Sequence, residues 1–190
     1  MNLLKSGLAV LALATLIAVP LMAQPTSIPK PRTRVSPHET ISTVIDGDRV
    51  TIVYGRPYSK DPKGTDVRKI WGTLVPFGKV WRTGADEATL FITEQPLVIG
   101  GTTVPAGAHT LFTLPSETGP TKLIINKQVG QWGETYDEKQ DLARIDLKKD
   151  APEASVDQFT MAIDKNSAGG GYIRMLWEKT QFAVAFTVKK

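Results

Sequence analysis

The feature that most restricts the fold of this chain is a strict alternation of large and small side chains near its C-terminus. Residues 182–188 have the sequence Phe-Ala-Val-Ala-Phe-Thr-Val, so every second residue is large and apolar. Successive side chains of a β-strand point to opposite faces, and a period of two therefore places one face in a core and leaves the smaller face outside. This segment predicts a strand with one buried face.

The same alternation recurs in other short segments, and turn residues separate them. It is present in residues 50–54, 89–93, 159–163 and 173–177, with shorter candidates at 111–114, 123–125 and 145–147. Asp46-Gly47-Asp48 is a strong hairpin signal, and Gly100-Gly101 lies between two β-branched segments. Helix signals are limited to one short turn in each of 67–74 and 134–142. We therefore expect an all-β fold, a single antiparallel β-sandwich or jelly-roll-like domain with one or two short helical turns.

The beginning of the chain has the pattern of an export signal. Residues 1–5 carry one lysine, 6–19 are apolar, and the small residue Ala23 suits a cleavage site. We therefore expect a signal peptide at 1–23, an extended Pro-rich linker at 24–35 and the β-sandwich domain at 36–190. The alternative is a retained membrane anchor, although the apolar run is short for a bilayer span of roughly 20 residues. The expected location is periplasmic or extracellular, with no membrane span in the mature chain.

Composition and motif content exclude several classes of chemistry. The chain has no cysteine, which removes thiol catalysis, disulfides and a lipid anchor at the cleavage point. Its 23 basic residues barely exceed its 19 acidic ones, and no basic cluster follows one segment, so nucleic acid is not an expected partner. His38 and His109, the only histidines, form no metal-ligand spacing, and there is no G-x-S-x-G elbow. We expect no cofactor and no metal site, and we expect His109 to pack at a strand start.

The best candidate for a site is the segment 81–89, Trp-Arg-Thr-Gly-Ala-Asp-Glu-Ala-Thr. A guanidinium can form two parallel hydrogen bonds to a carboxylate or phosphate, so Arg82 and an acid would line a polar pocket above Trp81. In the alternative, Arg82 bridges to Asp86 or Glu87 and pins the loop, while Trp81 fills the core. Because neighbours on an extended chain point to opposite faces, we expect only one of the two acids to join Arg82.

Two residues outside this segment complete the predicted ligand-binding set. Arg56 is a loop cation between Gly55 and Pro57. Trp132 has glycines nearby, which suits either an exposed ring that stacks on a sugar or grips a protein, or a packed loop anchor. The predicted ligand-binding residues are Arg56, Arg82, Asp86, Glu87 and Trp132, and no catalytic residue is predicted.

These motifs resemble those of a bacterial exported family of unknown function, numbered 2911. Residues 81–89 resemble its W-R-T-G-A-N-E-A-T signature, and other landmarks follow in the family's order. They are Ser36-Pro37, Tyr54-Gly55-Arg56-Pro57, Ile70-Trp71-Gly72, Leu74-Val75-Pro76-Phe77-Gly78, Pro105-Ala106-Gly107, Leu111-Phe112, Asn126-Lys127 and Gln131-Trp132-Gly133. Asp86 stands where asparagine is usual and lacks its amide donor, and His109 stands where tyrosine is frequent. The resemblance implies an exported all-β protein and transfers no activity.

Three functions remain open at this point. The first is an exported β-sandwich module that binds a small molecule, a glycan or an envelope protein without catalysis. The second is an exported hydrolase with a carboxylate acid or base at Asp86 or Glu87, with or without help from His38. The third is a structural envelope protein in which the signature residues only stabilise loops.

Overall fold

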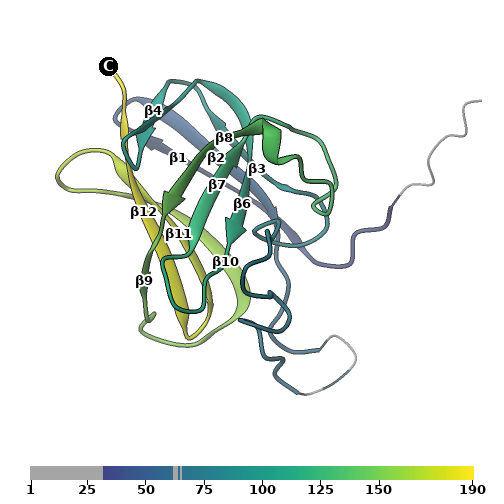
Figure 1. Cartoon of the computed structure of the whole chain (residues 1–190). Coiled ribbons are helices and arrows are strands. Elements are labelled where there is room, and N and C mark those ends of the chain that lie inside the picture. The colour runs from purple at the N-terminus through teal and green to yellow at the C-terminus, as the bar shows by residue number, and fades with distance from the viewer. Residues whose placement is uncertain (1–31, 62–63, 65) are drawn as a thin grey trace, which may run out of the picture. The chain divides into compact units, whose positions relative to one another are not determined.

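A computed structural model describes residues 32–61, 64 and 66–190 of the chain, and Thr33–Lys190 form one compact unit. The predicted signal peptide and most of the predicted linker lie outside the described residues. The regular structure of the unit consists of two antiparallel sheets and one turn of 3-10 helix, η1 (Glu138–Gln140) (Figure 1). The predicted all-β sandwich class is confirmed. Within the described residues, no helix has both the length and the apolar character needed to cross a membrane.

The first sheet has the strand order β1–β2–β3–β6–β7–β8. Its strands are β1 (His38–Ile45), β2 (Asp48–Gly55), β3 (Thr89–Thr93), β6 (Gly107–Leu114), β7 (Lys122–Asn126) and β8 (Asp141–Asp146). Asp46 and Gly47 connect β1 to β2 with φ angles of 48° and 85°, the pair of left-handed conformations that a two-residue hairpin of this type requires. The predicted hairpin is therefore confirmed.

The second sheet has the order β10–β11–β12–β4–β5. Its strands are β10 (Val156–Lys165), β11 (Gly171–Glu178), β12 (Thr180–Val188), β4 (Leu97–Ile99) and β5 (Thr102–Val104), and β9 (Lys148–Asp150) pairs with β12 beside β4. In β12 the side chains of Phe182 and Phe186 are buried whereas Ala185 and Thr187 are exposed. The alternation in the sequence therefore sets which face of β12 enters the core.

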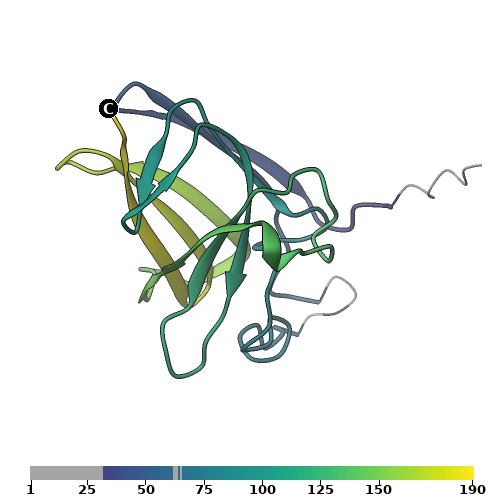
Figure 2. The ribbon, with the colours of Figure 1, turned by 45° about the horizontal axis from the view of Figure 1, so that its top comes forward.

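The core lies between the two sheets, which form the opposing walls in Figure 2. Fully or almost fully buried residues come from both sheets, among them Ile52, Phe91 and Leu111 of the first and Ile173 and Phe186 of the second. At one edge, Leu147 carries the chain from β8 directly into β9. At the other, β1 lies against β10, where the Thr43 hydroxyl donates to the Ile163 carbonyl. The two sheets are thus joined at one edge by the chain itself and at the other by contacts between β1 and β10.

The long connection between β2 and β3 covers the end of the sandwich at which those strands end and begin. Short bridges pair Tyr58 with Gln158, Trp81 with Thr113 and Glu87 with Trp132, so the connection is held to β10, to β6 and to the β7–β8 loop. Its residues 67–74, which we predicted as a helical turn, form isolated bridges and hydrogen-bonded turns, and Gly72, with a φ of 84°, does not continue a helical path. The second predicted turn is present as η1.

Candidate functional site

The signature segment 81–89 is largely buried and bonds to itself and to β6. Thr83 is completely buried, and its hydroxyl shares a 2.7 Å hydrogen bond with the hydroxyl of Thr113. The Thr89 hydroxyl donates to the Thr83 carbonyl at 2.7 Å, and the Trp81 indole donates to the Gly84 carbonyl at 3.1 Å. Most polar groups of this segment therefore maintain its own shape.

The shape of the segment depends on a close backbone crossing and on two left-handed residues. A Cβ on Gly55 would lie 2.2 Å from the carbonyl oxygen of Ala85, so only glycine fits there. Thr83 and Asp86 have φ angles of 52° and 64°, a region that non-glycine residues seldom adopt. Asparagine and aspartate tolerate it best, which explains why either suits position 86.

Asp86 and Glu87 both hold one N-terminal segment, residues 33–37, which we call the strap. The buried carboxylate of Asp86 accepts the backbone N–H groups of Val35 and Ser36 at 3.2 and 3.1 Å. Glu87 accepts Arg34 Nε at 2.8 Å. Both acids thereby fasten the strap to the signature segment.

His38, the first residue of β1, lies beside both acids. Its Nε2 is 2.9 Å from Glu87 Oε2, and its Nδ1 is 3.9 Å from Asp86 Oδ2. Our prediction that the two acids point to opposite faces is therefore wrong, although, as expected, only one of them, Asp86, lines the same cleft as Arg82. It assumed an extended chain, whereas the left-handed conformation of Asp86 turns both carboxylates toward the strap.

The charges around Glu87 favour its ionised form. Partial burial acts to raise the pKa of Glu87, but the hydrogen bond from Arg34 and the positive charges of Arg34 and His38 together lower the pKa below its ordinary value. A carboxyl group with a lowered pKa in the folded state stabilises the fold above its ordinary pKa, and this contribution disappears as the pH falls through the folded value.

A pH series tests this contribution directly. We expect Glu87→Gln to be less stable than the wild type at neutral pH, and the difference between the two to vanish in acid, below the ordinary value of 4.5. Urea unfolding across the pH range measures it. The matched control is Glu94→Gln, since Glu94 is exposed and lies 3.8 Å from Arg49. If the difference between the wild type and Glu87→Gln did not change with pH, the stabilising role of this carboxylate would be refuted.

Beside the strap lies an open cleft of about 640 Å³. The stacked indoles of Trp81 and Trp177 contribute to its apolar lining, with 5.8 Å between ring centroids and 17° between planes. The strap forms part of one wall, and the β2–β3 connection contributes most of the remaining lining. Its charged lining residues are Arg68, Arg82 and Asp86, of which Asp86 already accepts backbone donors of the strap. The cleft therefore combines an aromatic surface with two cations.

Of the charged residues in the signature segment, Arg82 makes the weakest polar contacts with the rest of the fold. Its Nη1 lies 3.7 Å from Glu134, so the predicted bridge to Asp86 or Glu87 is replaced by a long ion pair with a third, exposed acid. The stem of Arg82 packs against Gly133. Among the described residues, no acceptor contacts its buried Nε. A buried donor without an acceptor costs free energy, and a bound acceptor would recover it only if the Arg82 side chain turned its Nε toward the cleft.

The other predicted site residues lie in different surroundings. Arg56 links the two sheets: its Nε donates to the Phe159 carbonyl at 3.1 Å, and its Nη2 donates to the Thr160 hydroxyl at 2.8 Å. Glu87 lines a smaller cavity of about 180 Å³ together with Arg34 and His38. Trp132 is half-buried and pairs with Glu87 through its backbone. The five predicted residues therefore do not form one pocket, and only Arg82 and Asp86 line the cleft.

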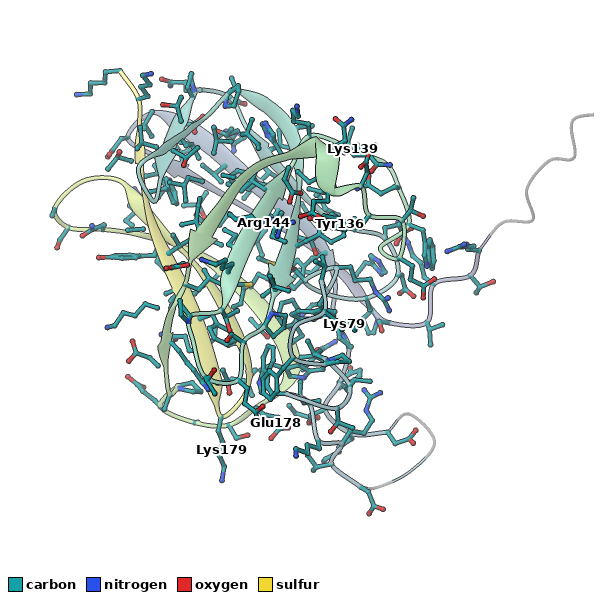
Figure 3. The ribbon with its side chains drawn as sticks, in the orientation of Figure 1. Lys79, Tyr136, Lys139, Arg144, Glu178 and Lys179 are labelled. Carbon is teal, nitrogen blue, oxygen red and sulfur yellow. The ribbon has the colours of Figure 1, made fainter. Side chains whose placement is uncertain are left out.

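His109 and the η1 region hold further titratable groups. His109 is buried in β6 beside Phe91, where burial lowers its pKa, and the expectation that it packs is confirmed. Near η1, Tyr136 donates to Asp141 at 2.6 Å and accepts from Arg144 (Figure 3). Burial and that acid raise the pKa of Tyr136 to about 12. These groups are engaged in packing and ion pairs within the fold.

Sequence reasoning missed Tyr58, Arg68 and Trp177 as cleft residues. No local motif marks them, because they are far apart in the sequence and meet only when the β2–β3 connection folds over β11. The alternation in 173–177 predicts that the Trp177 ring is buried, but it does not predict which ring it stacks on.

Comparison with known proteins gives one match. The model of a family described as "Protein of unknown function (DUF2911)" matches residues 36–186, from the strap into β12. No curated protein and no solved structure matches the chain.

Proposed function

The chain belongs to the DUF2911 family, and from that premise and its own geometry we propose that it is an exported protein that binds a small anionic molecule with an apolar body. The observation that carries the proposal is the buried Nε of Arg82, which has no acceptor among the described residues and belongs to a side chain lining the aromatic cleft. Export rests on the N-terminal sequence alone.

The apolar part of the ligand follows from the lining. Trp81 and Leu74 present ring and aliphatic surface to the cleft, whose lining also includes the buried residues Trp177 and Val75, and its volume of about 640 Å³ falls within the usual range of small-molecule sites. Aromatic faces that are partly solvated gain free energy when another apolar or planar surface covers them. A ligand with an aromatic or compact aliphatic body suits this lining.

The charged part follows from the two arginines. Arg82 keeps a donor available, and Arg68 lines the same cleft while bonding to the carbonyls of Tyr58 and Ser59. Hydrogen bonds between guanidinium groups and carboxylate or phosphate are about twice as strong as neutral ones. The carboxylate of Asp86 lies nearby, but two backbone donors already bind it. Glu134 also lies 3.7 Å from Arg82 Nη1, so the preference for an anion rests on guanidinium hydrogen bonds and not on an excess of positive charge.

The two alternative functions, a hydrolase and a structural envelope protein, are supported to different degrees. The contacts of Asp86 and Glu87 are with the strap, and no observation favours either as the acid or base of a hydrolase. A structural role does describe Thr83, Asp86 and Thr89, whose polar groups hold the loop. It does not describe Arg82, whose Nε bonds to nothing in the described fold.

A matched pair of probes tests the proposal. 1-Naphthoate and 1-naphthalenemethanol share one ring system and differ in charge, and quenching of tryptophan fluorescence reports their binding beside Trp81 and Trp177. We expect the wild type to bind the carboxylate more tightly than the alcohol. Arg82→Gln should weaken carboxylate binding by about tenfold or more, and should change alcohol binding little, because a charge-assisted hydrogen bond is worth about 1.5–3 kcal/mol.

Arg49→Gln is the control variant, because Arg49 is also partly exposed and paired with an acid but lies in β2, outside the cleft lining. It should bind both probes as the wild type does. Equal affinity of the wild type for the two probes would refute the anionic preference, and failure to bind either probe would refute the binding function.

A further inference from the structure

Exposed apolar side chains are concentrated at the opening of the cleft. Of the seven large apolar residues that are exposed in the described part of the chain, four belong to this region: Val35, Tyr58, Val67 and Leu74. Val35, Tyr58 and Leu74 line the cleft, and Val67 directly precedes Arg68, which also lines it. We call these four residues the mouth patch. Scattered single apolar residues are normal on a surface, whereas a group of them marks a contact with another surface.

Residues 57–82, the segment that contributes three of these four residues, also hold the excess positive charge of the chain. Residues 57–82 contain six basic side chains and two acidic ones, a net charge of +4, which equals the formal net charge of the whole chain. Subtracting them from the 23 basic and 19 acidic residues leaves 17 of each elsewhere. Sequence analysis found no basic cluster because these cations are spaced along a loop. Of the six, Lys60, Lys69 and Lys79 are exposed (Lys79 is labelled in Figure 3).

We propose that the mouth patch docks onto an anionic lipid bilayer. Apolar side chains flanked by lysine and arginine are the combination that binds such a surface, since the apolar groups enter the boundary of the acyl chains while the cations stay at the headgroups. In the sequence the two kinds of residue are close together, with Tyr58 near Lys60 and Val67 next to Arg68 and Lys69. This goes beyond the proposed function, which requires no membrane.

Charge complementarity selects a bilayer that carries negative charge. The acids within residues 57–82 are Asp61 and Asp66, and Glu87 beside the strap is paired with Arg34 and His38. The basic side chains of the region therefore remain in excess. A bilayer also accepts a loop surface of irregular outline without the shape complementarity that a folded partner protein requires.

Vesicle binding tests the proposal with the complete chain. Cosedimentation is measured with vesicles of phosphatidylcholine alone and of phosphatidylcholine mixed with an equal amount of phosphatidylglycerol. We expect the wild type to prefer the anionic vesicles, and the preference to weaken as salt is raised. Residues 1–31 are common to all variants, so any part of the binding that they supply is the same in every comparison.

Two pairs of variants separate the apolar and the charged contributions. Tyr58→Ser with Leu74→Ser, and Lys60→Gln with Lys69→Gln, should each lower the partition coefficient on anionic vesicles by about tenfold. The apolar control is Val44→Ser with Tyr172→Ser, because these exposed residues lie on β1 and β11. The charge control is Lys148→Gln with Lys149→Gln on β9. Both control pairs should bind as the wild type does, and circular dichroism should show all variants folded.

Several results would overturn the proposal. They are equal binding of the wild type to both kinds of vesicle, no binding to either, or equal losses in the test and control pairs. In those cases the mouth patch does not bind an anionic bilayer, and it contacts either a protein partner or no partner. Tyr58 and Leu74 also line the cleft, so only the Lys60→Gln with Lys69→Gln pair, which leaves the lining unchanged, separates vesicle binding from naphthoate binding.

Discussion

Gly55→Ala is expected to destabilise the protein by at least about 3 kcal/mol, the upper end for an added core methyl group, or to prevent folding. The new Cβ would lie 2.2 Å from the carbonyl oxygen of Ala85, which is a backbone atom. This backbone has little room to move, because the neighbours of Ala85 are fixed: Trp81 donates to the Gly84 carbonyl, and Asp86 binds the strap. Urea unfolding and the yield of soluble protein measure the effect.

Gly119→Ala is the control for this substitution. Its nearest atom is the Ser116 hydroxyl oxygen, at 3.4 Å from an added Cβ, so we expect a change of less than about 0.5 kcal/mol. Gly55 does not have a positive φ, so its substitution tests whether there is room for a side chain beside Ala85 and does not test backbone conformation. A stable Gly55→Ala variant would show that the crossing of β2 by the signature segment is not as close as described.

Trp81→Ala is expected to cost about 3–5 kcal/mol of the free energy of unfolding. Trp81 stacks on Trp177 and meets the rings of Trp71 and Phe159 edge-on, with centroids 5.9 and 5.1 Å away. The substitution removes these contacts together with the hydrogen bond to Gly84 and leaves a cavity between the loop and β11. Because the two indoles are stacked, near-UV circular dichroism should change as well as stability.

Two comparisons make the Trp81 result specific. Trp81→Phe keeps one ring and should retain a substantial part of the stability. Tyr172→Ala removes an aromatic side chain that is 37% exposed and should cost less than about 1 kcal/mol. If Trp81→Ala were no more costly than Tyr172→Ala, the aromatic cluster would not be the element that holds the β2–β3 connection on the sandwich.

The signature segment has two separate roles according to these contacts. Thr83, Asp86 and Thr89 position the backbone, and Glu87 secures the strap through Arg34 and His38. Trp81 and Arg82 are the members that present chemistry to the cleft.

Sequence reasoning succeeded where a property is local and failed where it depends on distant pairing. It placed Arg82 in a polar pocket above Trp81, and both residues line the cleft. It also placed Arg56 in the site, whereas that guanidinium bonds to Phe159 and Thr160, more than one hundred positions later in the chain. The acids were misplaced because the prediction assumed an extended chain, whereas Asp86 adopts a left-handed conformation.

The sequence by itself determined the all-β class, most of the strands and the Asp46–Gly47 hairpin. Side-chain alternation and turn conformation depend on neighbouring residues, so they can be recognised in a short segment. Only the tertiary structure decided that Arg68, Arg82 and Trp177 line one cleft, that Asp86 and Glu87 hold the strap, and that three exposed apolar residues line the same cleft. These arrangements depend on which strands pair and on where the β2–β3 connection lies, and both follow from the packing of the whole core.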